Sequence, residues 1–126
     1  MRLQHITIVR LEQDTDAMRS FYRDLVGLRE KPVPTSLHHL NLIWFNIGED
    51  AELHIMVEDT IDTVSNRHFC LAVDDIAPIR HKIERAGYVT WDVEEITGRP
   101  RFFSRDPSGN VLEFTMITDD YRKHQS

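Results

Sequence analysis

The chain has a single cysteine, Cys70, and it has no apolar run near the roughly 20 residues that a membrane-spanning helix needs. One cysteine excludes an internal disulfide and fits a reducing compartment, so we expect a cytoplasmic protein. The first residues also lack the apolar region and cleavage site of a signal peptide. From these absences we expect no membrane partner and no dependence on an oxidising environment.

Clustered positive charge is also missing. The chain has 15 Lys and Arg against 21 Asp and Glu, which gives a formal net charge of −6 at pH 7. Non-specific nucleic-acid binding needs Lys and Arg side chains that neutralise phosphates, so we expect no nucleic-acid partner. The sequence has no phosphate-binding loop, no Ser–His–Asp spacing and no CxxC pair. The partner classes that remain are a small molecule, a metal ion and another protein.

What the sequence does contain is typical of one folded domain. Its 126 residues are 40% hydrophobic and 29% charged, which suits a single domain over residues 1–126 with a hydrophobic core. Inside it, the order strand, helix, strand, strand, strand occurs twice. The first module covers about 1–58, a polar linker 59–66, the second module about 67–118 and a polar tail 119–126.

Hydrophobic periodicity and turn residues place the elements of both modules. The strands are predicted over residues 3–9, 28–34, 40–48 and 51–57, and then over 67–73, 88–95, 99–105 and 110–117. One helix is predicted over 14–28, with Asp14 or Thr15 as its cap and Gly27 at its end. The other is predicted over 74–87, with Asp74 or Asp75 as its cap and Gly87 at its end.

Four chemically unusual residues occupy matching strands of the two modules: His5, His54, His68 and Glu113. Because side chains alternate along a strand, each lies on the smaller, more polar face, opposite an apolar face that can cover the helix. A lone His or Glu on a strand is more often a hydrogen-bonded or solvated residue. If the modules pack with pseudo-two-fold symmetry, however, the four converge and suit a divalent transition metal. Without a metal, burying Glu113 would cost several kcal/mol or force its protonation.

With these residues in place, the sequence resembles the vicinal oxygen chelate superfamily, which includes glyoxalase I, bleomycin-resistance proteins, fosfomycin-resistance transferases and extradiol dioxygenases. The resemblance covers about residues 2–118 and is carried by "MRLQHITIV", "FYRDLVGL", "RHFCLAVDDI" and "FFSRDPSGNVLEF". It implies an α+β fold in which two βαβββ modules form an open, cupped mixed β-sheet with helices on the outside. It also implies a homodimer, in which the cup forms within one chain or across two.

Carried over by position, the resemblance implies a metal bound by His5, His54, His68 and Glu113. Zinc, nickel, manganese, cobalt and iron all remain open. Glu52 is the alternative ligand on the fourth strand, because it shares a face with His54. The resemblance also assigns catalytic roles to Glu113 and His54.

The reaction implied is that of a lyase or isomerase, in which the metal binds a small oxygenated substrate and stabilises an oxyanion. One alternative is an iron(II) dioxygenase of the extradiol type, held by His5, His68 and Glu113, with His54 left for proton transfer. Another is a non-catalytic binding protein of the bleomycin-resistance kind. Glyoxalase I has an arginine four residues after its first ligand. Val9 stands there in this sequence, which disfavours glutathione chemistry.

Three further side chains are candidates for substrate binding: Trp44, Arg101 and Phe103. Arg101 can hold a carboxylate or phosphate with two parallel hydrogen bonds, although a solvated surface arginine is an equal reading. Trp44 and Phe103 are, as types, more often plain core residues. Cys70 shares the face of His68 and is expected to be small buried filler.

Overall fold

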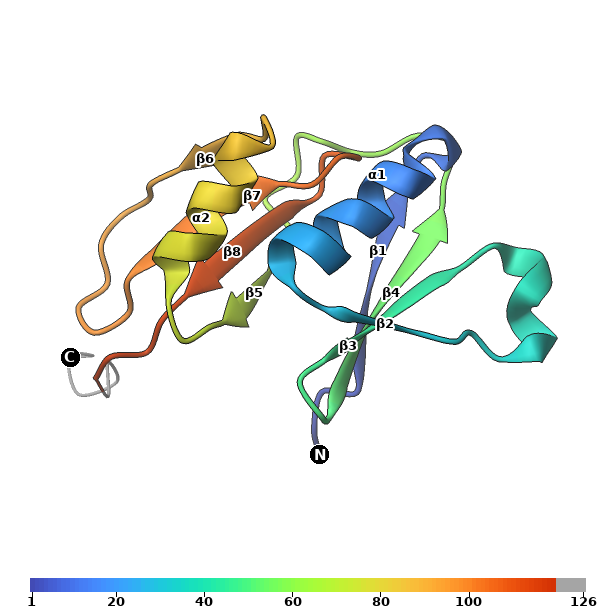
Figure 1. The fold of residues 1–126 in the computed structure, drawn as a ribbon, viewed down its shortest axis with the longest axis horizontal. Coiled ribbons are helices and arrows are strands. Elements are labelled where there is room, and N and C mark those ends of the chain that lie inside the picture. The colour runs from blue at the N-terminus through green and yellow to red at the C-terminus, as the bar shows by residue number, and fades with distance from the viewer. Residues whose placement is uncertain (120–126) are drawn as a thin grey trace. The chain divides into compact units, whose positions relative to one another are not determined.

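The computed structural model describes residues 1–119, so most of the predicted polar tail lies outside the described residues (Figure 1). The chain divides into two compact units, Met1–Thr63 and a second that begins at Val64. Each unit has its own four-stranded sheet and is described by itself. The assignment of both modules to one domain stays a prediction.

The sheet of the first unit has the strand order β1-β4-β3-β2. Its strands are β1 (His5–Arg10), β2 (Arg29–Lys31), β3 (Ile43–Ile47) and β4 (Ala51–Val57). The first strand runs parallel to the fourth, and the other pairs are antiparallel. This register sets His5 opposite Glu52 on β4, and His54 opposite Trp44 on β3. The residues singled out in the first module therefore share adjacent strands.

The helix of the first unit differs in part from the prediction. A short 3-10 turn, η1 (Glu12–Asp14), leads into α1 (Thr15–Ser20), and the chain then continues as the π-helix η2 (Phe21–Val26). Gly27 ends it with a φ of 89°, as its lack of a side chain allows. The predicted cap is wrong in its chemistry. Asp14 holds the cap position without a side-chain capping bond, and the Thr15 hydroxyl donates to the Glu12 carbonyl at 2.6 Å.

The core of the first unit lies between this helix and one face of the sheet. Its buried side chains are Met18, Phe21, Tyr22, Ile43, Phe45, Leu53 and Ile55, each at most 2% exposed. The rings of Tyr22 and Phe45 pack with their centroids 6.1 Å apart. Full burial of side chains of this size contributes about 1.5–3 kcal/mol each. One face of the sheet is thus committed to the helix, and the other carries the polar residues.

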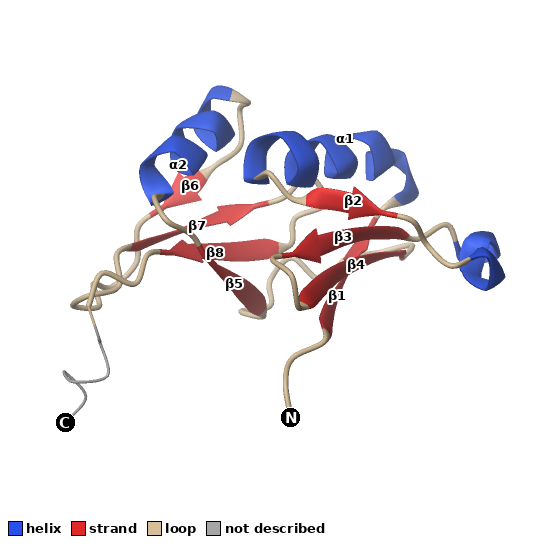
Figure 2. Ribbon diagram, turned by 60° about the horizontal axis from the view of Figure 1, so that its bottom comes forward, coloured by secondary structure: helices blue, strands red, loops and turns tan. Residues whose placement is uncertain are grey.

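The second unit repeats this topology with the strand order β5-β8-β7-β6. Its elements are β5 (His68–Ala72), α2 (Ile76–Arg85), β6 (Thr90–Trp91), β7 (Arg101–Arg105) and β8 (Val111–Thr115). The predicted cap is confirmed, since the Asp75 carboxylate accepts from the Ala77 amide at 3.1 Å. In both units the helix covers one face of its own sheet (Figure 2). The predicted α+β class and the two βαβββ modules are therefore confirmed.

Two predicted strands are much shorter than their sequence patterns suggested. The stretch 28–34 pairs only over Arg29–Lys31, because Pro32 and Pro34 have no amide hydrogen to donate. A 3-10 helix, η3 (Thr35–Leu40), follows, and its connection extends away from the sheet (Figure 1). The stretch 88–95 pairs only over Thr90–Trp91.

Within residues 1–119, no helix is long and apolar enough to cross a membrane.

Candidate functional site

The uncovered face of the first sheet carries a stack of three rings from three adjacent strands. The Trp44 ring lies on the His54 ring with a centroid distance of 3.9 Å and an interplanar angle of 3°. The His5 ring lies near the same imidazole, with centroids 4.1 Å apart and an angle of 18°. His54 therefore has a ring close to it from both neighbouring strands, which restricts its rotation.

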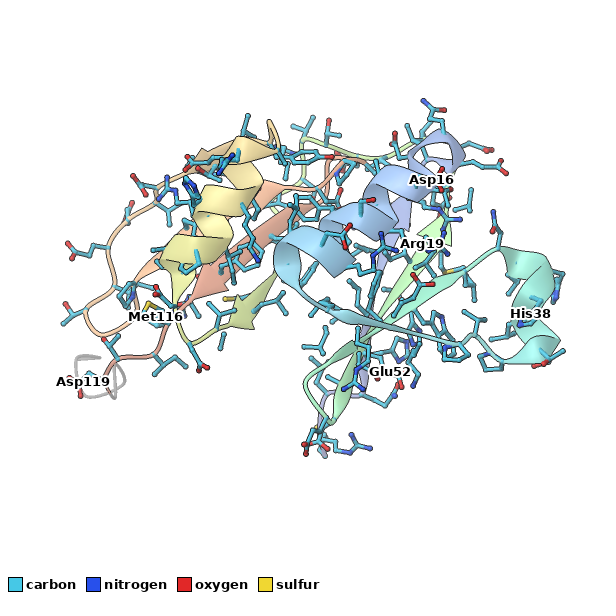
Figure 3. All side chains as sticks on the ribbon, viewed as in Figure 1. Asp16, Arg19, His38, Glu52, Met116 and Asp119 are labelled. Carbon is cyan, nitrogen blue, oxygen red and sulfur yellow. The ribbon has the colours of Figure 1, made fainter. Side chains whose placement is uncertain are left out.

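A carboxylate of the same strand fixes the tautomer of His54. The side chain of Glu52 is labelled in Figure 3. The Nε2 atom of His54 lies 2.9 Å from Oε1 of Glu52, and Oε2 of Glu52 accepts from the Lys31 ammonium group. Hydrogen bonds from Lys31 and His54 lower the pKa of Glu52 to about 2. The ionised carboxylate only accepts, so Nε2 of His54 carries the hydrogen. In the neutral imidazole, Nδ1 then holds the free lone pair.

The tautomer of His5 is fixed by its neighbour in sequence. Its Nδ1 atom lies 2.6 Å from the amide oxygen of Gln4, which can only accept a hydrogen bond. Nδ1 therefore donates, and the lone pair of the neutral ring is on Nε2. This arrangement, with one ring nitrogen bonded to an oxygen and the other free, is the one found for histidines that ligate metals.

In the second unit, His68 faces an oxygen acceptor at each of its ring nitrogens. Nδ1 lies 2.9 Å from the Asn66 carbonyl oxygen, and Nε2 lies 3.2 Å from Oε1 of Glu113. A neutral imidazole has one N–H, so it can satisfy only one of these acceptors. A neutral ring therefore leaves one of these two oxygens without a hydrogen bond from His68.

The carboxylate of Glu113 is nearly buried, with the residue 3% exposed. Its Oε2 atom accepts from the guanidinium of Arg99, and from Nη1 of Arg101 at 3.2 Å. Burial raises the pKa of Glu113, but the hydrogen bond from Arg101 and the charges of Arg99 and Arg101 outweigh it. The pKa lies below its ordinary value, so the carboxylate is ionised at neutral pH. The burial of Glu113 is thus compensated by ion pairs within its own unit.

Two further side chains lie on the same face of the second sheet. The Phe103 ring packs near His68 with centroids 4.8 Å apart. Cys70 pairs in register with Glu113, and burial together with the charge of that carboxylate raises the thiol pKa to about 11. The thiol is therefore protonated at neutral pH, as expected for an unreactive cysteine. The prediction of buried filler is wrong in one respect, because Cys70 is exposed at the surface of its own unit and its thiol is only partly buried.

The predicted site residues gather into two groups, one in each unit. The first unit brings together His5, His54 and Trp44, and the second His68, Glu113, Arg101 and Phe103. Among the described residues, no group of three or more His, Cys, Asp or Glu side chains is placed to hold a metal ion. The convergence of both groups on one metal stays a prediction.

Sequence reasoning missed the cations that hold the two carboxylates. Lys31 is two strands away from Glu52 in the sheet, and Arg99 precedes β7. Lys31 becomes visible once the register is known, because it pairs with Trp44, which in turn pairs with His54. Arg99 lies within the strand predicted over 99–105, where alternation places it on the face of Arg101, but it was not singled out, and the observed strand begins at Arg101.

Removing the ammonium group of Lys31 should raise the pKa of Glu52. In Lys31→Met we expect this pKa to rise from about 2 by about 1 or more, since the strongest partner of the carboxylate is lost. Because the folded pKa lies below the unfolded value, Glu52 stabilises the fold above about pH 4.5. That contribution is lost as the pH falls toward 2.

The test is a carbon-13 NMR titration of the glutamate carboxyl groups. The matched control is Arg29→Met, two positions earlier on the same strand, which should leave the Glu52 titration unchanged. An unaltered Glu52 titration in Lys31→Met would show that the ion pair does not set its pKa.

The fold is shared with solved structures over nearly the whole chain. A glyoxalase family protein from Bacillus anthracis aligns with a TM-score of 0.83 and 26% identity, over 93% of this chain and 95% of that one. The fosfomycin resistance protein FosX from Listeria monocytogenes aligns with a TM-score of 0.78 and 15% identity, over 97% and 98%. Lactoylglutathione lyase from Agrobacterium tumefaciens gives 0.66 and 21%, over 91% and 92%. The last two likenesses show a common fold alone.

No curated protein matches the chain in sequence. The sequence profile of the Glyoxalase/Bleomycin resistance protein/Dioxygenase superfamily, in contrast, matches residues 2–114. That match begins before β1 and ends within β8, so it includes both repeats and every strand that carries a candidate site residue. The resemblance found in the sequence is confirmed, and the chain belongs to the glyoxalase/bleomycin resistance protein/dioxygenase superfamily.

Proposed function

We propose that this chain is a metal-dependent enzyme of the lyase or isomerase type, acting on a small oxygenated substrate. Its proposed ligands are His5, His68 and Glu113. The observation that carries the proposal is the pair of acceptors around His68, the Asn66 carbonyl and the Glu113 carboxylate. A divalent cation at Nε2 of His68 would resolve this conflict, with Nδ1 left to donate to the backbone.

The donor atoms in each unit suit such a cation. In His5 and in His68, Nδ1 contacts an oxygen of the protein, so Nε2 is the nitrogen that would bind the metal. Glu113 is ionised, and its Oε2 atom is held by two guanidinium groups, which leaves Oε1 for a ligand bond. Outer partners of this kind orient metal ligands. We assign His54 to proton transfer, with Nδ1 as the acceptor, since Nε2 donates to Glu52 and leaves the lone pair on Nδ1.

A divalent metal bound there would supply Lewis-acid polarisation of a substrate oxygen. The chain supplies the proton acceptor. Nδ1 of His54 takes a proton, while Glu52 holds Nε2–H and stabilises the imidazolium that forms. Lys31 keeps Glu52 ionised, and the Trp44 ring restricts the rotation of the imidazole. Each of these roles rests on a contact within the first unit.

Metal-dependent stability tests this proposal. Tag-free protein is stripped with EDTA, and its thermal midpoint is measured with zinc, nickel, manganese, cobalt or iron(II). A ligand at 100 times its dissociation constant stabilises the native state by about 2.7 kcal/mol. We therefore expect a clear rise of the midpoint with at least one metal. A midpoint that ignores all five would contradict the proposal.

A second candidate is an iron(II) dioxygenase. The observation that favours it is the hydrogen bond from His54 to Glu52. With His54 assigned to proton transfer, two histidines and one carboxylate remain, which is the set used by non-haem iron oxygenases. Oxygen uptake with catechol after anaerobic iron loading would support this candidate. Turnover without oxygen after loading with zinc or manganese would support the first.

Homodimer formation is also proposed, and light scattering of the purified chain tests it.

A non-catalytic binding protein is the third reading. Binding of a ligand by such a protein should survive His68→Ala, because no metal ligand is needed for it. Turnover by either proposed enzyme should be lost in the same variant. The His68→Ala variant therefore distinguishes a non-catalytic binding protein from a metal-dependent enzyme.

A further inference from the structure

We infer that the substrate is a planar anion of the aromatic carboxylate class, bound on the uncovered face of the second sheet. The guanidinium groups of Arg101 and Arg105 would meet its carboxylate, and Phe103 and Trp91 would pack against its ring. This inference rests on the proposed function, because the same face carries His68 and Glu113. It adds the chemical class of the substrate, which neither the family nor its members' shared fold defines.

The register of the second sheet puts these side chains in neighbouring positions. Trp91 on β6 is opposite Phe103 on β7, and Phe103 is opposite Glu113 on β8. Along β7 the residues alternate, with Phe102 and Ser104 fully buried and Arg101, Phe103 and Arg105 partly exposed. The uncovered face of β7 therefore reads arginine, phenylalanine, arginine.

The charge of this face is opposite to that of the chain. The chain has a formal net charge of −6, yet three arginines, Arg99, Arg101 and Arg105, lie on or next to β7, and the first two pair with Glu113. Among residues 1–119, Arg105 has no carboxylate partner. Its contacts are the Gly109 carbonyl at 2.9 Å and the Trp91 ring, whose centroid is 5.8 Å from Cζ. Cations concentrated on one face of an acidic protein attract anions to it.

One guanidinium nitrogen on this face lacks an acceptor. Arg101 donates from Nη1 to Glu113 and from Nη2 to the Glu94 carbonyl at 2.8 Å, but its buried Nε meets no acceptor of the described protein. Buried donors are nearly always satisfied, so this nitrogen points to an acceptor that the second unit itself does not supply.

The aromatic residues favour a flat ligand over a bare oxyanion. The Trp91 and Phe103 rings lie 5.9 Å apart at 41°, and the Arg101 guanidinium lies 5.7 Å from the Phe103 centroid. A ring beside these surfaces gains aromatic contacts, while its carboxylate gains charge-assisted hydrogen bonds from arginine. Phosphate alone would use only the second of these interactions.

The test follows the tryptophan indole N–H signals of nitrogen-15-labelled protein by NMR, in EDTA, during titration with benzoate, benzamide or inorganic phosphate. The chain has two tryptophans, and Trp91→Phe assigns the signals. We expect benzoate to shift the Trp91 signal saturably, with a dissociation constant at least about tenfold below those of benzamide and phosphate. Arg105→Gln should weaken benzoate binding about tenfold. Arg85→Gln, which removes an exposed arginine of α2, should have no effect.

Arg105→Lys keeps the positive charge. It is the control for the possibility that Arg105→Gln loses binding because it fails to fold. It should bind benzoate within about threefold of the natural chain, because the Coulomb attraction remains. Equal binding of benzoate and benzamide, binding of phosphate as tight as benzoate, no binding of benzoate, or no effect of Arg105→Gln would each overturn the inference. Selective benzoate binding by a chain whose midpoint ignores metals would overturn the proposed function and leave the anion site standing.

Discussion

Replacing His68 with alanine is expected to weaken the binding of manganese(II) by at least about 100-fold, beyond the 10- to 100-fold typical of outer-shell partners. The physical reason is the loss of the Nε2 ligand atom. When Nδ1 of His68 donates to the Asn66 carbonyl, the lone pair on Nε2 is available to bind the metal. Isothermal titration calorimetry on EDTA-stripped protein measures the change.

The matched comparison is His54→Ala. We propose this imidazole, whose Nε2 donates to Glu52, as a proton acceptor and not as a ligand, so its loss should change the manganese dissociation constant by no more than about threefold while it lowers turnover. A 100-fold loss of affinity in His54→Ala would restore His54 to the ligand set. Manganese binding that survives His68→Ala would remove His68 from it.

Replacing Arg10 with methionine is expected to cost about 2–4 kcal/mol of unfolding free energy. The side chain is 0% exposed and donates to three oxygens, on Thr15 at 3.0 Å, Asn41 at 2.8 Å and Ile55 at 3.3 Å. Burial and the charge of Arg19 lower the pKa of the Arg10 guanidinium. Methionine keeps the apolar stem but cannot donate to any of these three oxygens.

Urea unfolding measures this cost, and Arg23→Met is the matched control. Arg23 is exposed and pairs with the adjacent carboxylate of Asp24, so its loss should leave the unfolding free energy unchanged within the error of the measurement. Equal effects of the two substitutions would mean that the buried hydrogen bonds of Arg10 add nothing to stability.

The parts of the fold that were predictable are those governed by local periodicity. The strand over 51–57 was predicted with its exact bounds, because apolar residues alternate along it and turn residues precede it. The ends of the helices were signalled by Gly27 and Gly87, whose positive φ angles other residues rarely adopt. The strand predicted over 88–95 was too long, because the alternation of apolar residues continues beyond the two residues that pair with a neighbouring strand.

The site was predictable only as far as the choice of residues on a strand face. Alternation placed His54 and Glu52 together, and the structure adds that the two are bonded to each other. That bond leaves Nδ1 as the free nitrogen of His54, and its role as ligand or as proton acceptor stays a prediction. The pairing of Glu113 with Arg99 and Arg101 was not predictable, because long side chains reach across strands whose register the sequence does not state.

The proposed function requires one divalent metal ion to be bound by His5, His68 and Glu113. A crystal structure of the manganese-loaded protein, with an anomalous difference map at the manganese edge, tests this requirement. We expect one strong peak per chain, in contact with Nε2 of His5, Nε2 of His68 and Oε1 of Glu113, and the map would show whether His5 comes from the same chain or a partner. A map without such a peak, or with manganese bound by other side chains, would contradict the proposal.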